Sequence, residues 1–215
     1  MSEHSEKPTV IVIDDDRNVR EALDGLLQSV GLRAQLFASA QEFINAPTRL
    51  DGPGCLILDV RLPGQSGLDF HDDLLRANIR IPVIFISGHA DVPMSVRAMK
   101  TGAVEFLTKP VRHQDLLDAI QTAISRDAAQ REVGQVQARI QVDYESLTPR
   151  ERGVFSLVVA GSPNKRIAEQ FGISIATVKL HRGNVMRKMR AHSLAELIRI
   201  ADKLPKAGSG TSTLG

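Results

Sequence analysis

The sequence lacks the features that mark secreted, membrane-spanning and cysteine-metal proteins. Its 215 residues include a single cysteine, Cys55, so no disulfide can form within the chain and cysteine-based zinc sites are excluded. No apolar run approaches the roughly 20 residues that cross a bilayer. The polar segment 1–8 also lacks the apolar core of a secretory signal. These absences predict a cytoplasmic protein in a reducing compartment, without a membrane partner.

A strong overall charge is also lacking, because 27 Lys and Arg nearly balance 25 Asp and Glu, for a net charge of +2. The balance is uneven along the chain. Residues 144–206 hold twelve basic and five acidic side chains, a net of +7, whereas residues 1–143 carry a net of −5. The length allows two domains of about 100 residues, and a basic second domain is a candidate for binding nucleic acid. Surface charge without a partner is the alternative.

Short apolar runs alternate with helical patterns in the first part of the chain. The run Val10–Ile13 fits a strand that is covered on both faces, and the helix expected after it ends at Gly31. Further strands are expected at 33–37, 55–58, 83–86 and 104–107. Because parallel strands need crossover helices, this alternation predicts an α/β domain with a doubly wound, five-stranded parallel sheet.

Polar side chains stand at the carboxyl ends of four of these strands. Asp14 and Asp15 follow the first strand, Asp59 the third, Ser87 the fourth and Lys109 the fifth. In an open parallel sheet these ends share one edge, so we expect the side chains to meet. Three crowded carboxylates repel one another unless a cation relieves them, and ligand sets made only of oxygen favour Mg²⁺.

The expected chemistry of this group is phosphoryl transfer. Asp59 is the candidate nucleophile, because a carboxylate can attack phosphorus and form an acyl phosphate. Lys109 would balance the charge of the phosphoryl group, and Ser87 would hydrogen-bond one of its oxygens. Each residue alone is more simply explained as a helix cap, a turn residue or a solvated side chain. Their joint placement on four strands is what indicates a site.

A helical second domain is expected after a linker. Residues 126–143 are rich in Gln, Arg, Ala and Glu and keep a weak helical period, which predicts a helical or partly flexible linker. Residues 147–204 read as helical, and the Gly- and Ser-rich tail 206–215 is expected to be disordered.

Within this second domain the pattern indicates a helix-turn-helix. Thr148–Glu151 is a capping-box sequence that starts one helix, and a short second helix ends at the Gly172 turn. A basic helix from Ile175 to Met189 follows, and such a helix fits the major groove of DNA. A basic helical bundle that binds protein is the alternative.

The motifs of the first part resemble the receiver domains of bacterial two-component response regulators. The resemblance covers residues 8–125, and Gly88–Lys100 is similar to the FixJ subgroup in particular. It rests on Val12–Asp16, Leu58–Leu68, Ile86–Gly88 and Phe106–Pro110. It implies a flavodoxin-like (CheY-like) fold.

This resemblance also implies roles for individual residues. Asp59 would accept phosphate from a sensor histidine kinase, and Lys109 would contact the phosphoryl group next to a bond to Pro110 that is usually cis. Ser87 and Phe106 would form a switch pair; since the aromatic residue is Phe and not Tyr, switching would rest on packing alone. The implied Mg²⁺ ligands are Asp14, Asp15, Asp59 and the main-chain carbonyl of Arg61.

Residues 144–205 resemble the LuxR-type DNA-binding domain, so the whole chain is similar to response regulators of the FixJ/NarL type. The matching segments include Leu147–Glu151, Asn164–Ala168 and Thr177–Arg182. The resemblance implies a four-helix, all-α domain. Gly183 stands where some relatives carry a longer base-reading side chain, so part of the direct readout is expected to be absent. The implied DNA contacts are Lys165, Thr177, Lys179, Leu180, Arg182 and Lys188.

The sequence therefore predicts a phosphorylation-controlled transcription regulator and not an enzyme. Phosphate on Asp59 is expected to favour a receiver conformation that forms a homodimer. Two basic domains would then bind the half-sites of a promoter operator and act on RNA polymerase. Two alternatives stay open, a protein-interaction adaptor controlled by phosphorylation and a magnesium-dependent phosphohydrolase. The hydrolase is disfavoured because Arg61, and not a general acid, stands two residues beyond Asp59.

Overall fold

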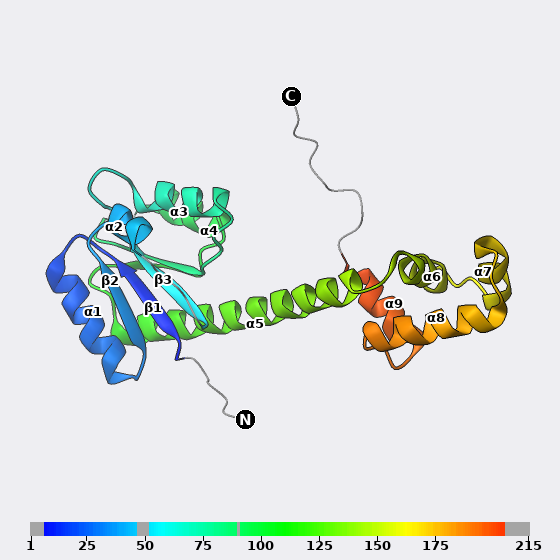
Figure 1. Ribbon diagram of the computed structural model, residues 1–215. Coiled ribbons are helices and arrows are strands. Elements are labelled where there is room, and N and C mark those ends of the chain that lie inside the picture. Colours follow the sequence, from blue (N-terminus) through cyan, green and yellow to red (C-terminus); the bar gives the residue numbers. More distant parts are fainter. Residues whose placement is uncertain (1–6, 47–51, 90, 205–215) are drawn as a thin grey trace. The chain divides into compact units, whose positions relative to one another are not determined.

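The computed structural model describes residues 7–46, 52–89 and 91–204, and the chain divides into two compact units, residues 1–131 and 132–215. The first unit is a sheet covered by helices, and the second consists of helices (Figure 1). No helix in the described parts of the chain is long and apolar enough to cross a membrane. The tail expected at 206–215 lies outside the described residues.

In the described residues of the first unit, five parallel strands form a sheet in the order β2-β1-β3-β4-β5. This confirms the doubly wound sheet that the sequence predicts. The elements are β1 (Thr9–Ile13), α1 (Arg17–Ser29), β2 (Arg33–Phe37), α2 (Ala40–Asn45), β3 (Gly54–Asp59), α3 (Gly67–Arg76), β4 (Val83–Ser87), α4 (Val92–Lys100), β5 (Glu105–Thr108) and the first part of α5 (His113–Glu145).

Two hydrophobic cores cover the two faces of this sheet. Successive side chains of a strand point to opposite faces, so Val10 and Val12 pack with residues of α1 and α5. Ile11 and Ile13 pack instead with residues of α2, α3 and α4 on the other face (Figure 1). Because both faces are covered, these strands are apolar without interruption and leave polar side chains only at their ends.

Local capping residues fix where several helices begin. The side chain of Asp16 accepts a hydrogen bond from the backbone N–H of Asn18 at the start of α1. Ser39 caps α2, and Ser66 caps α3. These caps satisfy backbone N–H groups that have no partner inside the helix. They also set the turns that follow β1 and β3.

Helix α5 runs through the segment that the sequence leaves open between helix and flexible chain. A buried carboxylate ties its middle to the sheet. Asp127 accepts a hydrogen bond from the backbone N–H of Gly54, where β3 begins, at 2.9 Å, and one from Nε of Arg131 at 2.6 Å. The residues beyond Arg131 belong to the second unit, whose core includes Ile140 and Tyr144.

The second unit adds four helices to the end of α5. The predicted capping box is present: the Thr148 side chain accepts from the Glu151 N–H, and the Glu151 carboxylate accepts from the Thr148 N–H. Gly172 ends the second helix in the left-handed conformation, with φ of 62°. The helices are α6 (Pro149–Val159), α7 (Asn164–Phe171), α8 (Ile175–Lys188) and α9 (Leu194–Asp202).

Gly67 at the start of α3 provides a test of how the sheet edge is built. A Cβ atom at Gly67 would lie 2.1 Å from the backbone oxygen of Asp59, where no flexible group can yield. We expect Gly67→Ala to lower the free energy of unfolding of the first unit by about 1–3 kcal/mol. Urea unfolding followed by circular dichroism measures this loss.

The matched control is Gly25→Ala in α1, since no heavy atom lies within 4 Å of a Cβ at Gly25. Alanine favours a helix over glycine, so the Gly25 variant should be as stable as the unaltered chain or slightly more stable. A Gly67→Ala protein with an unchanged unfolding midpoint would contradict the close approach.

Candidate functional site

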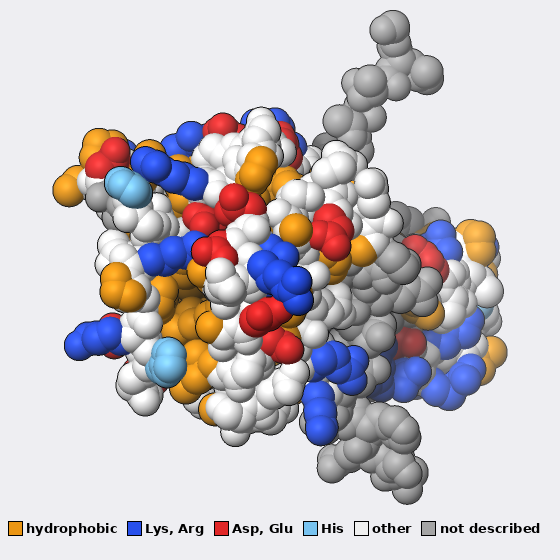
Figure 2. All heavy atoms as spheres, turned by 90° about the vertical axis from the view of Figure 1, so that its left-hand side faces the viewer, with side chains coloured by type: hydrophobic (Ala, Val, Ile, Leu, Met, Phe, Trp, Pro, Cys, Tyr) orange, Lys and Arg blue, Asp and Glu red, His pale blue; other side chains and the backbone are white. Residues whose placement is uncertain are grey.

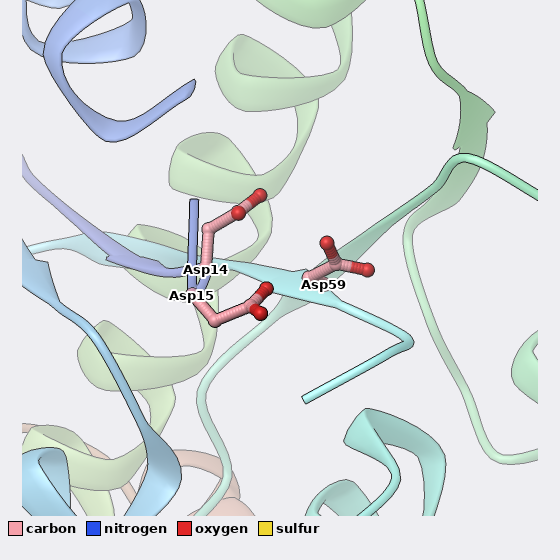
Figure 3. Close-up of side chains that lie close together, drawn as sticks. All are labelled: Asp14, Asp15 and Asp59. Carbon is pink, nitrogen blue, oxygen red and sulfur yellow. The ribbon is translucent and has the colours of Figure 1, made fainter. Parts of the chain in front are cut away.

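Three carboxylates meet at the edge where the chain turns away from β1 and β3. Asp14 and Asp15 follow β1, and Asp59 is the last residue of β3, the strand paired with β1. Their oxygens lie within 4.8 Å of one another (Figure 3). This is the point at which the strand order reverses, with β2 on one side of β1 and β3 on the other. The structure thus brings together the acidic residues that the sequence assigns to one site.

Lys109, which follows β5, supplies a positive charge to this group. Its Nζ lies 2.6 Å from Oδ2 of Asp14 and 2.5 Å from Oδ2 of Asp59. Asp14 is 0% exposed and Asp59 is 5% exposed, so both carboxylates are removed from water. Burial raises the pKa of Asp14 despite the hydrogen bond from Lys109. Burial alone would lower the pKa of Lys109, but its hydrogen bonds to the two carboxylates raise it.

Backbone contacts hold the carboxylates in place. Oδ1 of Asp14 accepts from the Asp16 N–H, and Oδ1 of Asp59 accepts from the Arg61 N–H, both at 2.9 Å. Arg20 on α1 donates from Nη1 to the backbone oxygen of Asp14 at 2.6 Å. Sequence reasoning missed Arg20, because a lone arginine on a helix gives no signal that it reaches back to a backbone carbonyl.

The donor set fits a hard divalent cation. Three carboxylates face one ammonium group, so the site keeps an excess of negative charge, and all of its acidic ligand atoms are oxygens. Asp15 is exposed, which gives an ion access from solvent. These are the properties that Mg²⁺ needs, since it binds few carboxylates and keeps several waters.

The two expected switch residues lie on β4 and β5, Ser87 at the carboxyl end of β4 and Phe106 opposite Phe85 within the sheet. Ser87 is buried at the end of β4, and its hydroxyl donates to the backbone oxygen of His89 at 3.1 Å. Phe106 is half-buried on β5, with its ring centroid 6.4 Å from that of Phe85. The Lys109–Pro110 peptide bond is cis.

In the second unit, α8 presents a polar face opposite its buried one. Val178 and Val185 are buried in the core, whereas Lys179 is exposed and Leu180 is 65% exposed. Thr177 is half-buried in the first turn, with its hydroxyl 2.9 Å from that of Ser174. The side chains of Lys179 and Leu180 are exposed, so the core of this unit does not depend on them. This face of α8 is therefore available for a ligand.

Two other basic residues of α8 are engaged within the unit. Lys188 donates from Nζ to Oε2 of Glu151 at 2.6 Å and to the backbone oxygen of Ser146 at 3.0 Å. Arg182 donates from Nη1 to Oδ1 of Asn164 on α7 at 2.7 Å. The structure therefore gives Lys188 a role in holding α8 to α6, which the sequence did not indicate. Arg182 uses one of its five donors and keeps the others.

Comparisons with known proteins agree with this geometry. A family model of the response regulator receiver domain matches residues 10–121, and one of the bacterial regulatory proteins of the luxR family matches residues 145–201. "Nodulation protein W" of Bradyrhizobium diazoefficiens is 50% identical over 203 residues, which are 94% of this chain and 89% of that protein. "Transcriptional regulatory protein FixJ" of the same organism is 40% identical over 91% of this chain and 95% of its own.

Solved structures lead to the same family. The response regulator StyR has a TM-score of 0.84 at 44% identity and covers 92% of this chain and 99% of its own. Full-length FixJ from B. japonicum has a TM-score of 0.54 at 40% identity, over 91% and 96% of the two chains.

The chain therefore belongs to the response regulators that join a receiver domain to a LuxR-type DNA-binding domain. It is a DNA-binding transcription regulator and not an enzyme, which decides against the phosphohydrolase. The receiver domain implies a sensor kinase as partner.

The Glu151–Lys188 pair makes the stability of the second unit depend on pH. The hydrogen bond from Lys188, and then that from the Thr148 N–H, lower the pKa of Glu151 from 4.5 to about 2. Because the folded-state pKa is the lower one, this stabilisation is complete above pH 4.5 and is lost as the pH falls toward about 2. At neutral pH we expect Glu151→Gln to lower the free energy of unfolding by about 2 kcal/mol.

Urea unfolding followed by Tyr144 fluorescence measures this difference. The chain has one tyrosine and no tryptophan, and Tyr144 lies against Phe155 in the core of the second unit. The gap between the two proteins should close as the pH falls below 4.5. Glu169→Gln, at an exposed carboxylate of α7, is the control and should leave the midpoint unchanged. Equal sensitivity of both variants would contradict the assignment.

Proposed function

We propose that this protein accepts a phosphoryl group on Asp59 from a sensor histidine kinase and then binds a promoter as a dimer. The observation that carries this proposal is the Lys109 ammonium, which bridges Asp14 and Asp59 at the sheet edge. A cation beside a buried carboxylate suits the capture of an anion there. We further propose a cytoplasmic location, because the protein must reach both a kinase and DNA.

The transfer itself needs little from the protein beyond positioning and charge. An oxygen of Asp59 attacks phosphorus, and the bond from phosphorus to the kinase histidine breaks with its electron pair left on nitrogen. Lys109 then stabilises the new phosphoryl oxygens, and the hydroxyl of Ser87 donates to one of them. Mg²⁺ held by Asp14, Asp15, Asp59 and the carbonyl of Arg61 would supply further charge stabilisation when bound.

The kinase would dock beside this site. An apolar pocket between α1 and the start of α5 reaches Lys109 and Pro110. Figure 2 shows apolar side chains gathered in a hollow on a face that also carries acidic side chains. The pocket suits an apolar helix surface of the partner, because its lining is mostly hydrophobic. Its lining includes Val19, Ala22, Leu23, Leu26, Val111 and Leu116.

Phosphorylation would act on dimerisation through Ser87 and Phe106. When the Ser87 hydroxyl turns to the phosphoryl group it leaves its bond to His89, and Phe106 moves into the space this opens. Helix α4 lies beside β5 and exposes apolar side chains, among them Val92 at 76%. Such exposure on a helix fits a face that a second copy covers. The exposed apolar residues of α4 are Val92, Val96 and Met99.

The paired second units would then bind two half-sites of an operator. Lys179 and Leu180 would meet base edges in the major groove, while Lys165, Thr177 and Arg182 would contact phosphates or flanking bases. Lys188 stays in the proposed set of contacts, although its ammonium also holds Glu151. Contact with RNA polymerase would follow from binding at a promoter.

Asp59→Asn tests the phosphoacceptor. We expect the variant to fold but to gain no phosphoryl group from a small phosphodonor with Mg²⁺, as measured by intact mass spectrometry, because the amide cannot form the acyl phosphate. Asp16→Asn is the control: Asp16 is exposed and caps α1, and asparagine caps as well as aspartate. The Asp16 variant should be labelled as the unaltered chain is. If the Asp59→Asn variant is labelled, the phosphoacceptor is a residue other than Asp59.

Lys179→Ala tests the DNA surface. On a duplex selected from a randomised library by the unaltered chain, we expect a loss of about 1–3 kcal/mol if Lys179 meets a base. If it meets a phosphate, the dependence of affinity on salt should weaken by about one unit of slope. Lys203→Ala removes the same charge outside α8 and controls for net charge. An unchanged isotherm for Lys179→Ala removes this residue from the interface, and no DNA selection at all favours the protein-interaction adaptor.

A further inference from the structure

Gly183 is an unusual residue for its place in the fold. It lies in the interior of α8, which runs from Ile175 to Lys188, and it is exposed. Glycine destabilises a helix interior relative to alanine, because it has more backbone freedom to lose on folding. Its presence there therefore calls for a reason.

The packing of the described residues supplies no such reason. No heavy atom lies within 4 Å of the point where a Cβ on Gly183 would stand, and its φ is not in the left-handed region. Gly153 on α6 is different, because its Cβ would lie 2.6 Å from the ring of Phe171. An alanine at 153 would force the ring of Phe171 to shift, whereas the structure would accept alanine at 183 with no movement.

Helical geometry puts Gly183 in the middle of the exposed face. At about 3.6 residues per turn, it is one turn from Lys179, Leu180 and Arg187, and two turns from Ala176. All four of these are exposed. Alanine has a small side chain and glycine has none, so Ala176 and Gly183 leave a strip of the helix surface where the backbone is accessible. Lys179 and Leu180 stand on either side of this strip.

We propose that Gly183 determines DNA sequence specificity by letting the backbone of α8 approach a thymine. This rests on the DNA binding proposed above. The C5-methyl of thymine is the one apolar group that base edges offer in the major groove. Leu180 offers an apolar side chain, and the missing side chain at 183 leaves room for the methyl against the helix backbone. The absence of a base-reading side chain is thus itself a steric element of readout.

The test compares Gly183→Ala with the unaltered chain, both as full-length protein with beryllium fluoride and Mg²⁺. The unaltered chain first selects a preferred site from a randomised duplex library. We expect Gly183→Ala to unfold at a higher temperature, followed by Tyr144 fluorescence, and yet to bind the selected duplex roughly tenfold more weakly. Affinity for a duplex of unrelated sequence should stay the same.

Replacement of single thymines by uracil in the selected duplex isolates the methyl group. We expect one pair in each half-site at which uracil weakens the unaltered chain several-fold but leaves Gly183→Ala unaffected. Gly134→Ala, in the exposed part of α5, is the matched control because a Cβ there also meets no heavy atom within 4 Å. It should keep full affinity and full sensitivity to uracil.

The outcomes separate this inference from the proposed function. If the unaltered chain selects no sequence, the proposed DNA binding fails. If it selects a site and Gly183→Ala binds that site equally well, or no thymine responds to uracil, Gly183 is not a determinant. If Gly134→Ala weakens binding as much as Gly183→Ala does, the effect comes from helix stability, and the inference is overturned as well.

Discussion

The first unit depends on one buried interaction, the contact of the Lys109 ammonium with Asp14 and Asp59. Asp14 follows β1, Asp59 ends β3 and Lys109 follows β5, so a single cation joins three elements. Two carboxylates this close and this buried would repel without it. Any ion or phosphoryl group that enters must share these oxygens with Lys109. Occupancy of the site would therefore change the contacts of Lys109, which follows β5 and stands three residues from Phe106.

This short path is the one along which the proposed phosphorylation would change the face formed by α4 and β5. Phe106 packs toward Phe85, which lies two residues before Ser87 on β4. Both strands thus carry one residue at the acidic edge and one aromatic ring in the same core. Phe106 has no hydroxyl to bond with solvent or a neighbour, so in the proposed switch only its packing would distinguish the two states. A close-packed core admits discrete arrangements, and this makes packing sufficient for a switch.

Sequence reasoning recovered the parts of the fold that local signals encode. The strands are predictable because they are apolar throughout, and the site is predictable because Asp14, Asp59 and Lys109 each end a strand of one parallel sheet. The role of Lys188 was not predictable, since its partner Glu151 is 37 residues away and they meet only through the crossing of α6 and α8. In the same way, the constraint on Gly67 depends on a backbone atom of another element and leaves no local pattern.

Some basic residues of the second unit are engaged in contacts within the unit, so its net charge overstates the positive charge that is available to DNA. The net charge of +7 over residues 144–206 suggests strong attraction to DNA, but Lys188 is held by Glu151 and Arg150 contacts the ring and the carbonyl of Phe171. Fewer cations are then free to replace counterions on the phosphates, and non-specific affinity falls with each one lost. In the proposed mechanism a single unit would therefore bind weakly, and two units linked in a dimer would gain affinity from their effective concentration. Weak binding by each unit is what would make the proposed dimerisation an effective switch.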